Sequence, residues 1–196
     1  MTGGSDPIAL FGTSADPPTR GHRALLEGLL NRYPAVATWA SDNPLKQHTA
    51  PLPLRVSLLR AVVEAIADPR LELHQELSSP WAIETLARAR RRWPGRTPVL
   101  VIGSDLAASI HHWRQAKALL TDARLAVVPR AGWPLQAADL QRLQQAGAEV
   151  EVLPLTVPAS ASSRLRGDRS PGLATDLLTE LHPLLLQENP YGLPLS

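Results

Sequence analysis

The sequence predicts an α/β fold, a doubly wound parallel sheet with a small helical part at its C-terminal end. Short apolar segments alternate along the chain with longer segments whose apolar residues recur at helical spacing. Residues 98–102 carry four aliphatic side chains in a row, which is typical of a central parallel strand covered on both faces. The 196 residues suit one domain spanning 1–196, with its helical C-terminal part at about 160–190.

Strands are expected where a short apolar run is followed by turn residues. They are residues 8–11, 35–40, 71–73, 98–102, 124–128 and 150–153. Helices are expected between and after them, at residues 21–30, 54–66, 81–92, 106–120, 136–145 and 173–187. Tyr33-Pro34, Trp93-Pro94 and Gly147 are expected stops, and Pro183 is expected to break the last helix into two pieces.

The composition is that of a soluble globular protein, with 44% apolar residues and charges of both signs. A formal net charge of +2 gives no support for binding to nucleic acid or to a membrane surface. Cysteine is absent, which excludes disulfides and thiolate metal sites. The N-terminal residues show neither a basic start nor an apolar run, and no segment is long enough to span a bilayer, so a cytoplasmic location is expected.

The segment GTSADPPTRGH, residues 12–22, joins the first expected strand to the first expected helix. It opens with a tight turn of small residues, and its two prolines then impose an extended passage. Thr19 is a suitable cap for a helix that begins near Gly21, so Thr19 and His22 lie at the positive end of that helix. Backbone N–H groups are unpaired there and bind phosphate readily, which makes this segment the first candidate site.

This segment resembles the (H/T)xGH signature of nucleotidylyltransferases. Its flanks are most similar to bacterial, cyanobacterial-like nicotinate or nicotinamide mononucleotide adenylyltransferases, whose usual form is close to GGTFDPxHxGH. The resemblance implies a Rossmann-like nucleotidylyltransferase fold in which Thr19 and His22 hold the phosphates of ATP. Thr13 replaces the usual second Gly, Ala15 the usual Phe, and Thr19 the usual first His. A threonine hydroxyl donates to a phosphate oxygen as an imidazole does.

The stretch NPLKQHTAPLPLRVSLL, residues 43–59, resembles the P-H-K segment of the same family, which is followed by an Arg and an apolar helix. By this resemblance Lys46 neutralises phosphate charge, although Leu45 stands where His is usual. Arg55 is equally consistent with contacting the ligand and with orienting the loop.

The stretch SSPWAIET, residues 78–85, resembles the family's S-Y-T-x-D-T segment, with Trp81 in place of Tyr. In the family, backbone amides around the last Thr, here Thr85, hold the carboxylate or amide of the pyridine ring. A helix N-terminus with Thr85 packed inward is the alternative that stays open.

Gly103, Ser104 and Asp105, with Trp113 further along, resemble the family's G-(A/S)-D…W pattern. A carboxylate at the end of the central strand is well placed to accept ribose hydroxyls, to lie near Mg²⁺, or to cap the next helix. The flat face of Trp113 suits stacking of a pyridine ring.

Two further segments complete the family order. Arg130 in VVPRAG resembles the Arg of V-x-R-x-G, and ASSRLR, residues 161–166, resembles I-S-S-T-x-I-R. The second resemblance implies that Ser162, Ser163 and Arg166 hold the β- and γ-phosphates, the guanidinium bidentately.

The resemblance implies an enzyme that transfers the adenylyl group of ATP to nicotinate mononucleotide, giving deamido-NAD and pyrophosphate in NAD biosynthesis. ATP and the pyridine mononucleotide are the implied partners, and Mg²⁺ is delivered with ATP. Because Mg²⁺ arrives with ATP and keeps its waters, no metal site made by the protein alone is expected. A metal shared by the adjacent His111 and His112 is not expected either, because neighbouring residues on a helix point away from each other. Alternatives are nicotinamide mononucleotide as sole or second acceptor, another acceptor such as phosphopantetheine, and a nucleotide-binding module without turnover.

The implied site residues fall into three groups. They are the catalytic His22, Thr19, Lys46 and Arg166; the ATP-binding Gly12, Thr13, Ser14, Thr19, His22, Gly103, Asp105, Arg130, Ser162, Ser163 and Arg166; and the mononucleotide-binding Ser14, Lys46, Thr85 and Trp113.

Overall fold

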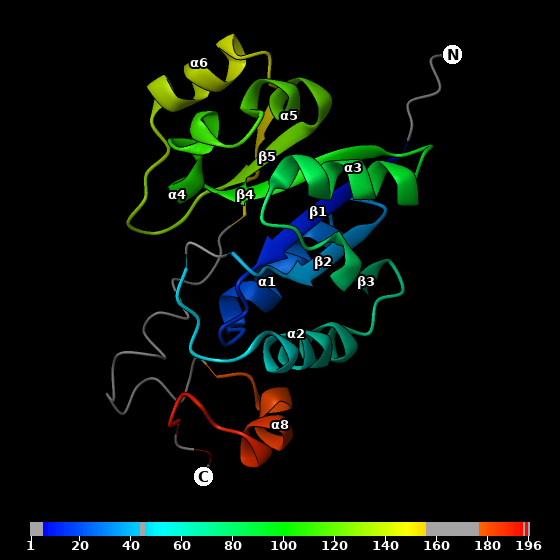
Figure 1. The fold of residues 1–196 in the computed structure, drawn as a ribbon, viewed down its shortest axis with the longest axis vertical. Coiled ribbons are helices and arrows are strands. Elements are labelled where there is room, and N and C mark those ends of the chain that lie inside the picture. The colour runs from blue at the N-terminus through cyan, green and yellow to red at the C-terminus, as the bar shows by residue number, and fades with distance from the viewer. Residues whose placement is uncertain (1–5, 44–45, 156–176, 194, 196) are drawn as a thin grey trace.

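A computed structural model describes residues 6–43, 46–155, 177–193 and 195 of the chain (Figure 1). Its centre is a six-stranded sheet with the order β3-β2-β1-β4-β5-β6, and all paired strands are parallel. The strands are β1 (Pro7–Thr13), β2 (Val36–Ala40), β3 (Leu71–Leu73), β4 (Thr97–Gly103), β5 (Arg124–Val128) and β6 (Val150–Val152). The predicted doubly wound parallel sheet is therefore confirmed, and each strand lies within two residues of its expected bounds.

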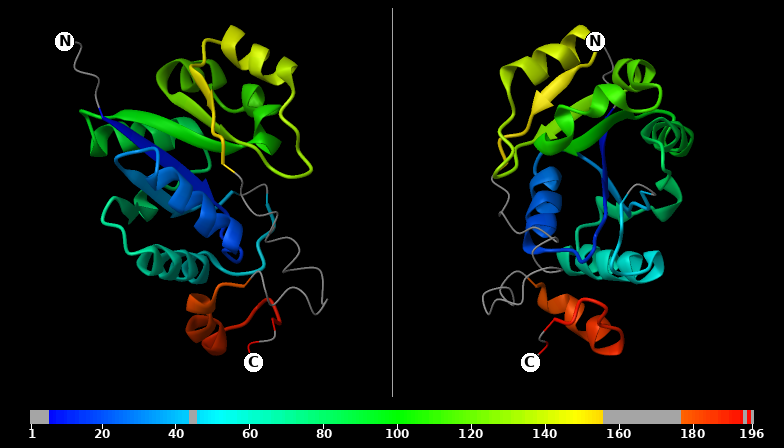
Figure 2. Two further views of the ribbon diagram at one scale, coloured as in Figure 1. Left: turned by 180° about the vertical axis from the view of Figure 1, so that it is seen from behind. Right: turned by 60° about the vertical axis from the view of Figure 1, so that its left-hand side comes forward.

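Helices cover both faces of this sheet (Figure 2). They are α1 (Arg20–Leu30), α2 (Leu52–Ile66), α3 (Ala82–Arg92), α4 (Ser104–Ala107), α5 (Ala116–Asp122), α6 (Ala137–Gln145) and α8 (His182–Gln187), with short 3-10 turns η1 (Gln75–Leu77), η2 (Ile110–His112) and η4 (Thr179–Leu181). None of the helices in these described stretches combines the length and hydrophobicity needed to cross a bilayer.

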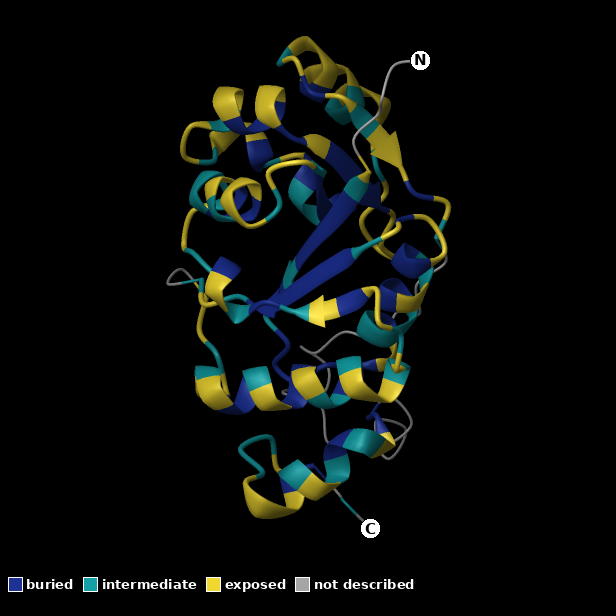
Figure 3. Ribbon diagram, turned by 90° about the vertical axis from the view of Figure 1, so that its right-hand side faces the viewer, coloured by how far each residue is buried: buried dark blue, intermediate teal, exposed yellow. Residues whose placement is uncertain are grey.

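Alternation along the strands divides the core into two layers. Ala9 and Phe11 of β1 pack in one apolar cluster with α1, α2 and the C-terminal segment, whereas Leu10 faces the other side with Trp39 and Leu77. The helices α3 to α6 contribute to the clusters on that second face. The middle strands are buried on both faces, as Figure 3 shows in dark blue, which explains their uninterrupted apolar runs.

The expectation of one continuous helix over residues 106–120 is wrong in the middle of that range. The chain forms α4, then η2, and then passes through Trp113 in an extended conformation (φ −70°, ψ 154°) before α5 begins. Ser109, Ile110 and the two histidines before Trp113 are weak helix formers, and the Ser109 hydroxyl donates to the carbonyl of Leu106 instead of leaving the backbone to continue the helix.

Pro183 also acts differently from the expectation. It lies in the first turn of α8, where the N–H that proline lacks has no intrahelical partner, so it begins a helix rather than breaking one. The C-terminal helical part is described from residue 177 onward, and residues 160–176 of that expected part lie outside the described residues.

Candidate active site

The candidate site lies at the carboxyl ends of the central strands. After β1 the chain turns to α1 on one face of the sheet, and after its neighbour β4 it turns to α4 on the other face. This reversal is the place where doubly wound sheets leave a crevice for a ligand. The loops after β1, β2, β4 and β5 begin at this edge, and they carry most of the residues singled out by the sequence motifs.

Gly12 is required by its neighbour on β2. It pairs in register with Trp39, and a Cβ at Gly12 would lie 2.6–2.7 Å from three atoms of the Trp39 indole. The turn that follows is held by the Thr13 hydroxyl, which accepts the N–H of Ala15 at 3.3 Å, and Ala15 has a φ of 49°. The small residues of this turn therefore have a packing role, whether or not they also approach a nucleotide.

Replacing Gly12 by alanine is expected to lower the free energy of unfolding by about 1–3 kcal/mol, because the new methyl group overpacks a fully formed contact. Urea denaturation measures this change. Gly95→Ala is the matched control, since a Cβ there meets nothing within 4 Å. Equal stability of the two variants would contradict the assigned contact, and Trp39→Phe combined with Gly12→Ala should restore part of the loss.

Thr19 and His22 lie together in the first turn of α1. Thr19 is the N-cap and is fully buried, and His22 is the third residue of the helix. The backbone N–H of Thr19 donates to Nδ1 of His22 at 3.1 Å, and Thr19 Oγ1 lies 2.9 Å from the same nitrogen. The imidazole thus takes the place that Glu or Gln has in a capping box.

This arrangement fixes the protonation state of His22. Because a backbone N–H only donates, Nδ1 must accept, and the ring proton is assigned to Nε2. Burial of the imidazole and, second, the positive charge of Arg130 lower the pKa of His22 from 6.5 to about 4. His22 is therefore neutral near pH 7, and its Nε2–H has no hydrogen-bond partner in the described part of the chain.

An NMR titration of the imidazole nitrogens should place the midpoint for His22 near pH 4 in the free protein, with Nε2 protonated at neutral pH. Arg130→Ala is expected to raise this pKa but to leave it below 6.5, because burial is the larger cause. The folded pKa is depressed, so the contribution of His22 to the free energy of unfolding is constant above pH 6.5 and is lost as the pH falls toward 4. A midpoint near 6.5 in the folded protein would contradict this assignment.

Arg55 holds the loops after β1 and β2 together. Its side chain is only 1% exposed, and it donates to the carbonyls of Ala50, Ser14 and Ser41 and to the carboxylate of Asp42, over 2.8–3.1 Å. Of the two roles left open by the sequence, the structure shows the orienting one. These four hydrogen bonds all go to protein atoms in the loops after β1 and β2, which they hold together.

Lys46 is exposed on the second of these loops, and its backbone N–H donates to the carbonyl of Asn43 at 3.0 Å. The expected contact between Lys46 and phosphate stays a prediction.

Asp16 connects the segment of residues 12–22 to the loop after β2 through hydrogen bonds. Its carboxylate is 1% exposed and accepts the N–H groups of Thr49 at 2.8 Å and Ala50 at 3.0 Å, as well as the hydroxyl of Tyr191 at 2.9 Å. The sequence gives no indication of this role, because an Asp before two prolines is also an ordinary turn residue.

The β4 loop is tied to the β5 loop by side chains. The Ser104 hydroxyl accepts the N–H of Arg130 at 2.9 Å and donates to the carbonyl of Trp133 at 2.7 Å, and Arg130 Nη1 donates to Asp105 Oδ2 at 2.8 Å. Gly103, the N-cap of α4, has no room for a Cβ beside Asp105 and Arg130. Asp105 lies in the first turn of α4 and does not cap it, which corrects one of its expected roles.

The charge of Arg130 acts on His22, so the structure brings the β1, β4 and β5 loops together around one place. Ser162, Ser163 and Arg166 lie outside the described residues.

Thr85 is not available to a ligand in the expected way. It is 3% exposed, its hydroxyl donates to the carbonyl of Leu77 at 2.9 Å, and its N–H donates to the carbonyl of Trp81 at 3.2 Å within α3. This is the inward packing that was the open alternative. The amides of Ala82 and Ile83 come first in α3, where N–H groups lack intrahelical partners, so they replace Thr85 as candidates.

The aromatic residues near α3 are arranged in two ways. Trp113 is partly buried against the apolar cluster formed by residues of β4, α5 and β5, whereas Trp81 is 40% exposed and has the Arg114 guanidinium 5.1 Å from its ring centroid.

The rings of His111 and His112 lie side by side, with centroids 3.7 Å apart, so the expectation that they point away from each other is wrong. Both belong to the short turn η2 rather than to an α-helix.

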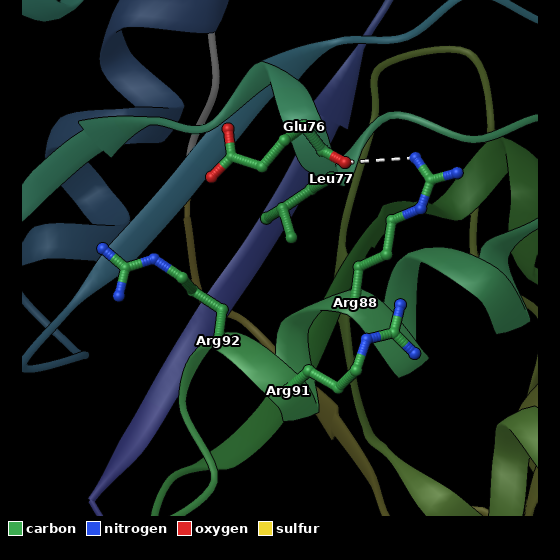
Figure 4. A pocket seen from close by; sticks show the side chains of 5 residues that line it. All are labelled: Glu76, Leu77, Arg88, Arg91 and Arg92. Atoms are coloured by element: carbon green, nitrogen blue, oxygen red, sulfur yellow. Dashed lines mark hydrogen bonds between the residues drawn. The ribbon is translucent and has the colours of Figure 1, made fainter.

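A shallow pocket of about 380 Å³ lies between η1 and α3 (Figure 4). It is lined by Glu76, Leu77, Arg88, Arg91 and Arg92. Arg88 donates to the carbonyl of Glu76 at 3.1 Å and to that of Ser78, so its guanidinium joins α3 to η1. This lining contains none of the residues singled out by the sequence motifs.

Within the described stretches, no three His, Cys, Asp or Glu side chains gather closely enough to hold a metal ion. Asp105 Oδ1 is buried without a hydrogen-bond partner there. One carboxylate oxygen combined with substrate phosphates is a common way for proteins to hold Mg²⁺, and Asp105 fits that donor set.

Comparison with known proteins extends this picture. A family model described as cytidylyltransferase-like matches residues 10–166. A Synechocystis protein called "Probable nicotinate-nucleotide adenylyltransferase" is 38% identical over 172 residues, which cover 79% of this chain and 86% of the relative. A Methylorubrum extorquens protein with the same name is 30% identical over 188 residues, covering 88% and 98%. The solved structure of Plasmodium falciparum nicotinic acid mononucleotide adenylyltransferase complexed with NaAD superposes with a TM-score of 0.79 at 16% identity, covering 97% and 100%, and so shares the fold.

Proposed function

The chain belongs to the cytidylyltransferase-like family, and we propose that it is a nicotinate-nucleotide adenylyltransferase of NAD biosynthesis. It joins the adenylyl group of ATP to nicotinate mononucleotide and releases pyrophosphate. The observation that carries this proposal is the placement of His22 at the N-terminus of α1, at the switch point of the sheet, where Nδ1 accepts the Thr19 N–H and the ring proton is therefore on Nε2. The names of relatives that share 30–38% of their residues with this chain supply the acceptor.

The reaction needs no general base. An oxygen of the mononucleotide 5′-phosphate, already an anion, forms a bond to the α-phosphorus of ATP. The bond from that phosphorus to the bridging oxygen breaks, and its electron pair leaves with pyrophosphate. The protein therefore contributes orientation and charge stabilisation. A neutral imidazole that donates one hydrogen bond fits this requirement.

The roles of the phosphate-binding residues follow from charge and position. His22 Nε2–H, at the positive end of α1, holds the reacting phosphates, and Arg130 and Lys46 neutralise their charge. Thr19 supports this role rather than sharing it, because its buried hydroxyl donates to Nδ1 of His22. Ser162, Ser163 and Arg166 are assigned to the departing pyrophosphate by the motif alone.

Substrate positioning uses the neighbouring loops. The turn at Gly12, Thr13 and Ser14 approaches the nucleotide, and Gly103 and Asp105 bind ribose at the end of β4. The pyridine ring stacks on Trp113, and its carboxylate is held by the first amides of α3.

Asp105 Oδ1 and the ATP phosphates would hold Mg²⁺, which neutralises phosphate charge when bound. Arg130 keeps Asp105 Oδ2 in place, so that Oδ1 is the oxygen left to serve this purpose or a ribose hydroxyl.

A pyrophosphate-release assay with ATP and Mg²⁺ tests the proposal, with nicotinate and nicotinamide mononucleotide offered side by side. A strong preference for the acid is the expected result. Comparable use of both would make the enzyme dual-specific. Binding of ATP without release from either acceptor would overturn the proposal in favour of another acceptor, such as phosphopantetheine, or a binding module without turnover.

A further inference from the structure

The C-terminal segment returns to the N-terminal motif. Residues 177–193, here called the strap, pack in the same apolar cluster as α1 and α2, and they lie below α2 in Figure 1. The Tyr191 hydroxyl donates to Asp16 Oδ1 at 2.9 Å, and Arg23 Nη1 donates to Glu180 Oε1 at 3.0 Å. Asp16 and Arg23 stand on either side of Thr19 and His22 in the sequence, so the strap holds the motif at both ends.

The contact at Asp16 reaches two loops at once. Asp16 Oδ1 accepts the N–H of Ala50 in addition to the Tyr191 hydroxyl, and Asp16 Oδ2 accepts the N–H of Thr49. Because Asp16 is 1% exposed, its orientation is set by the protein rather than by water, and these donors act together with His48, whose Nδ1 lies 3.7 Å from Oδ2. Asp16 therefore connects Tyr191 to the turn before Thr19 and to the loop that carries Lys46.

Tyr191 is itself presented by a built turn. The Asn189 side chain donates to the carbonyl of Leu193 at 2.9 Å and accepts the N–H of the same residue at 3.2 Å. This reciprocal pair closes residues 189–193 into a loop, in which Gly192 has a φ of 63°. The Tyr191 hydroxyl thus reaches Asp16 from a fixed support.

The contact at Arg23 acts on the other side of the motif. Arg23 directly follows His22, and besides Glu180 it contacts Glu27 of its own helix at 3.0 Å. Glu27 is half exposed, whereas the Glu180 side chain is only 15% exposed. The pair with Glu180 is the one that depends on the C-terminal segment.

We propose that Tyr191 is a positioning residue for the site, and that the strap sets the geometry of Thr19 and His22 through Asp16 and Arg23. The proposal rests on the proposed function for its kinetic consequence. Catalysis by orientation is sensitive to displacements of about 1 Å, so a loosened motif should lose turnover before it loses ATP binding. The competing view is that the strap only covers apolar surface on α1 and α2.

Tyr191→Phe is the test, because it removes one hydroxyl and leaves the ring. The chain offers a matched control in its other tyrosine: the Tyr33 hydroxyl also donates to a carboxylate, that of Glu151 at 3.2 Å, away from the motif. Glu180→Gln, with Glu27→Gln as its control, tests the second contact. Each full-length variant is compared with wild type by thermal unfolding, by ATP affinity, by steady-state pyrophosphate release, and by hydrogen exchange over residues 13–23.

The proposal expects Tyr191→Phe to lower kcat about tenfold with ATP affinity changed less than twofold, and to speed hydrogen exchange in residues 13–23. Tyr33→Phe should change Tm by a similar amount and leave kcat and this exchange as in wild type. Equal kcat in the two tyrosine variants, or unchanged exchange at the motif in Tyr191→Phe, would overturn the proposal. Wild-type protein that releases no pyrophosphate would overturn the proposed function instead, and hydrogen exchange would then decide on the strap by itself.

Discussion

His22→Ala is expected to lower kcat about a hundred- to a thousandfold while ATP affinity changes much less. In the proposed mechanism the neutral imidazole donates one hydrogen bond from Nε2 to a reacting phosphate, and removing a single preorganised donor from a site of developing charge has effects of about this size. A comparable fall in kcat and in ATP affinity would contradict a role in the transition state. Steady-state pyrophosphate release and calorimetric titration with ATP give the two quantities.

A control is needed because His22 also stabilises its helix. Its Nδ1 accepts the Thr19 N–H, so His22→Ala removes part of the cap and should lower Tm. His22→Gln replaces the imidazole by a side chain that completes a capping box, and it should recover most of the Tm. If Tm recovers in His22→Gln while kcat stays low, the loss of turnover in His22→Ala comes from the missing imidazole donor and not from the helix cap.

The sheet and the place of the site are the parts of this protein that short-range patterns predict. The run at 98–102 favours a strand covered on both faces, because such a strand needs apolar side chains throughout and the run is too short for a buried helix. Motifs that each follow a strand must come together at one edge of a parallel sheet. This topology brings Arg130 near His22, whose pKa its positive charge lowers. It also brings Arg130 to Asp105, with which it forms an ion pair.

Local patterns fail where a distant partner decides. Thr85 matches a motif whose backbone amides are expected to bind the ligand, yet its own N–H donates to the carbonyl of Trp81. Its hydroxyl donates to the carbonyl of Leu77, which only the packing of η1 on α3 brings near. The contact between Tyr191 and Asp16 spans 175 positions, and nothing in the composition of either segment indicates it. The helix expected through Trp113 fails for another reason. The residues before Trp113 are weak helix formers, and Trp113 packs against an apolar cluster of the sheet in an extended conformation instead.

Arg55→Met is expected to lower the free energy of unfolding by about 3–5 kcal/mol, the largest stability loss anticipated for this site, because several buried acceptors lose their donor at once. The guanidinium is buried, and three of its four partners are backbone carbonyls that would be left without this donor. Arg55→Lys should recover only part of the loss, because a point-like ammonium cannot reach carbonyls in three directions at once.

Asp42→Asn separates the ion pair from the carbonyl contacts of Arg55. The Asp42 side chain is 58% exposed, so its pairing with Arg55 should contribute less than about 1 kcal/mol, which urea denaturation can measure beside Arg55→Met. A large loss in Asp42→Asn together with a small one in Arg55→Met would mean that charge pairing, and not the joining of loops, is the role of Arg55. The expected order gives Arg55 a structural role, because its hydrogen bonds set where Ser14 and the loop of Lys46 lie, and the proposed phosphate contacts of Lys46 would then depend on it.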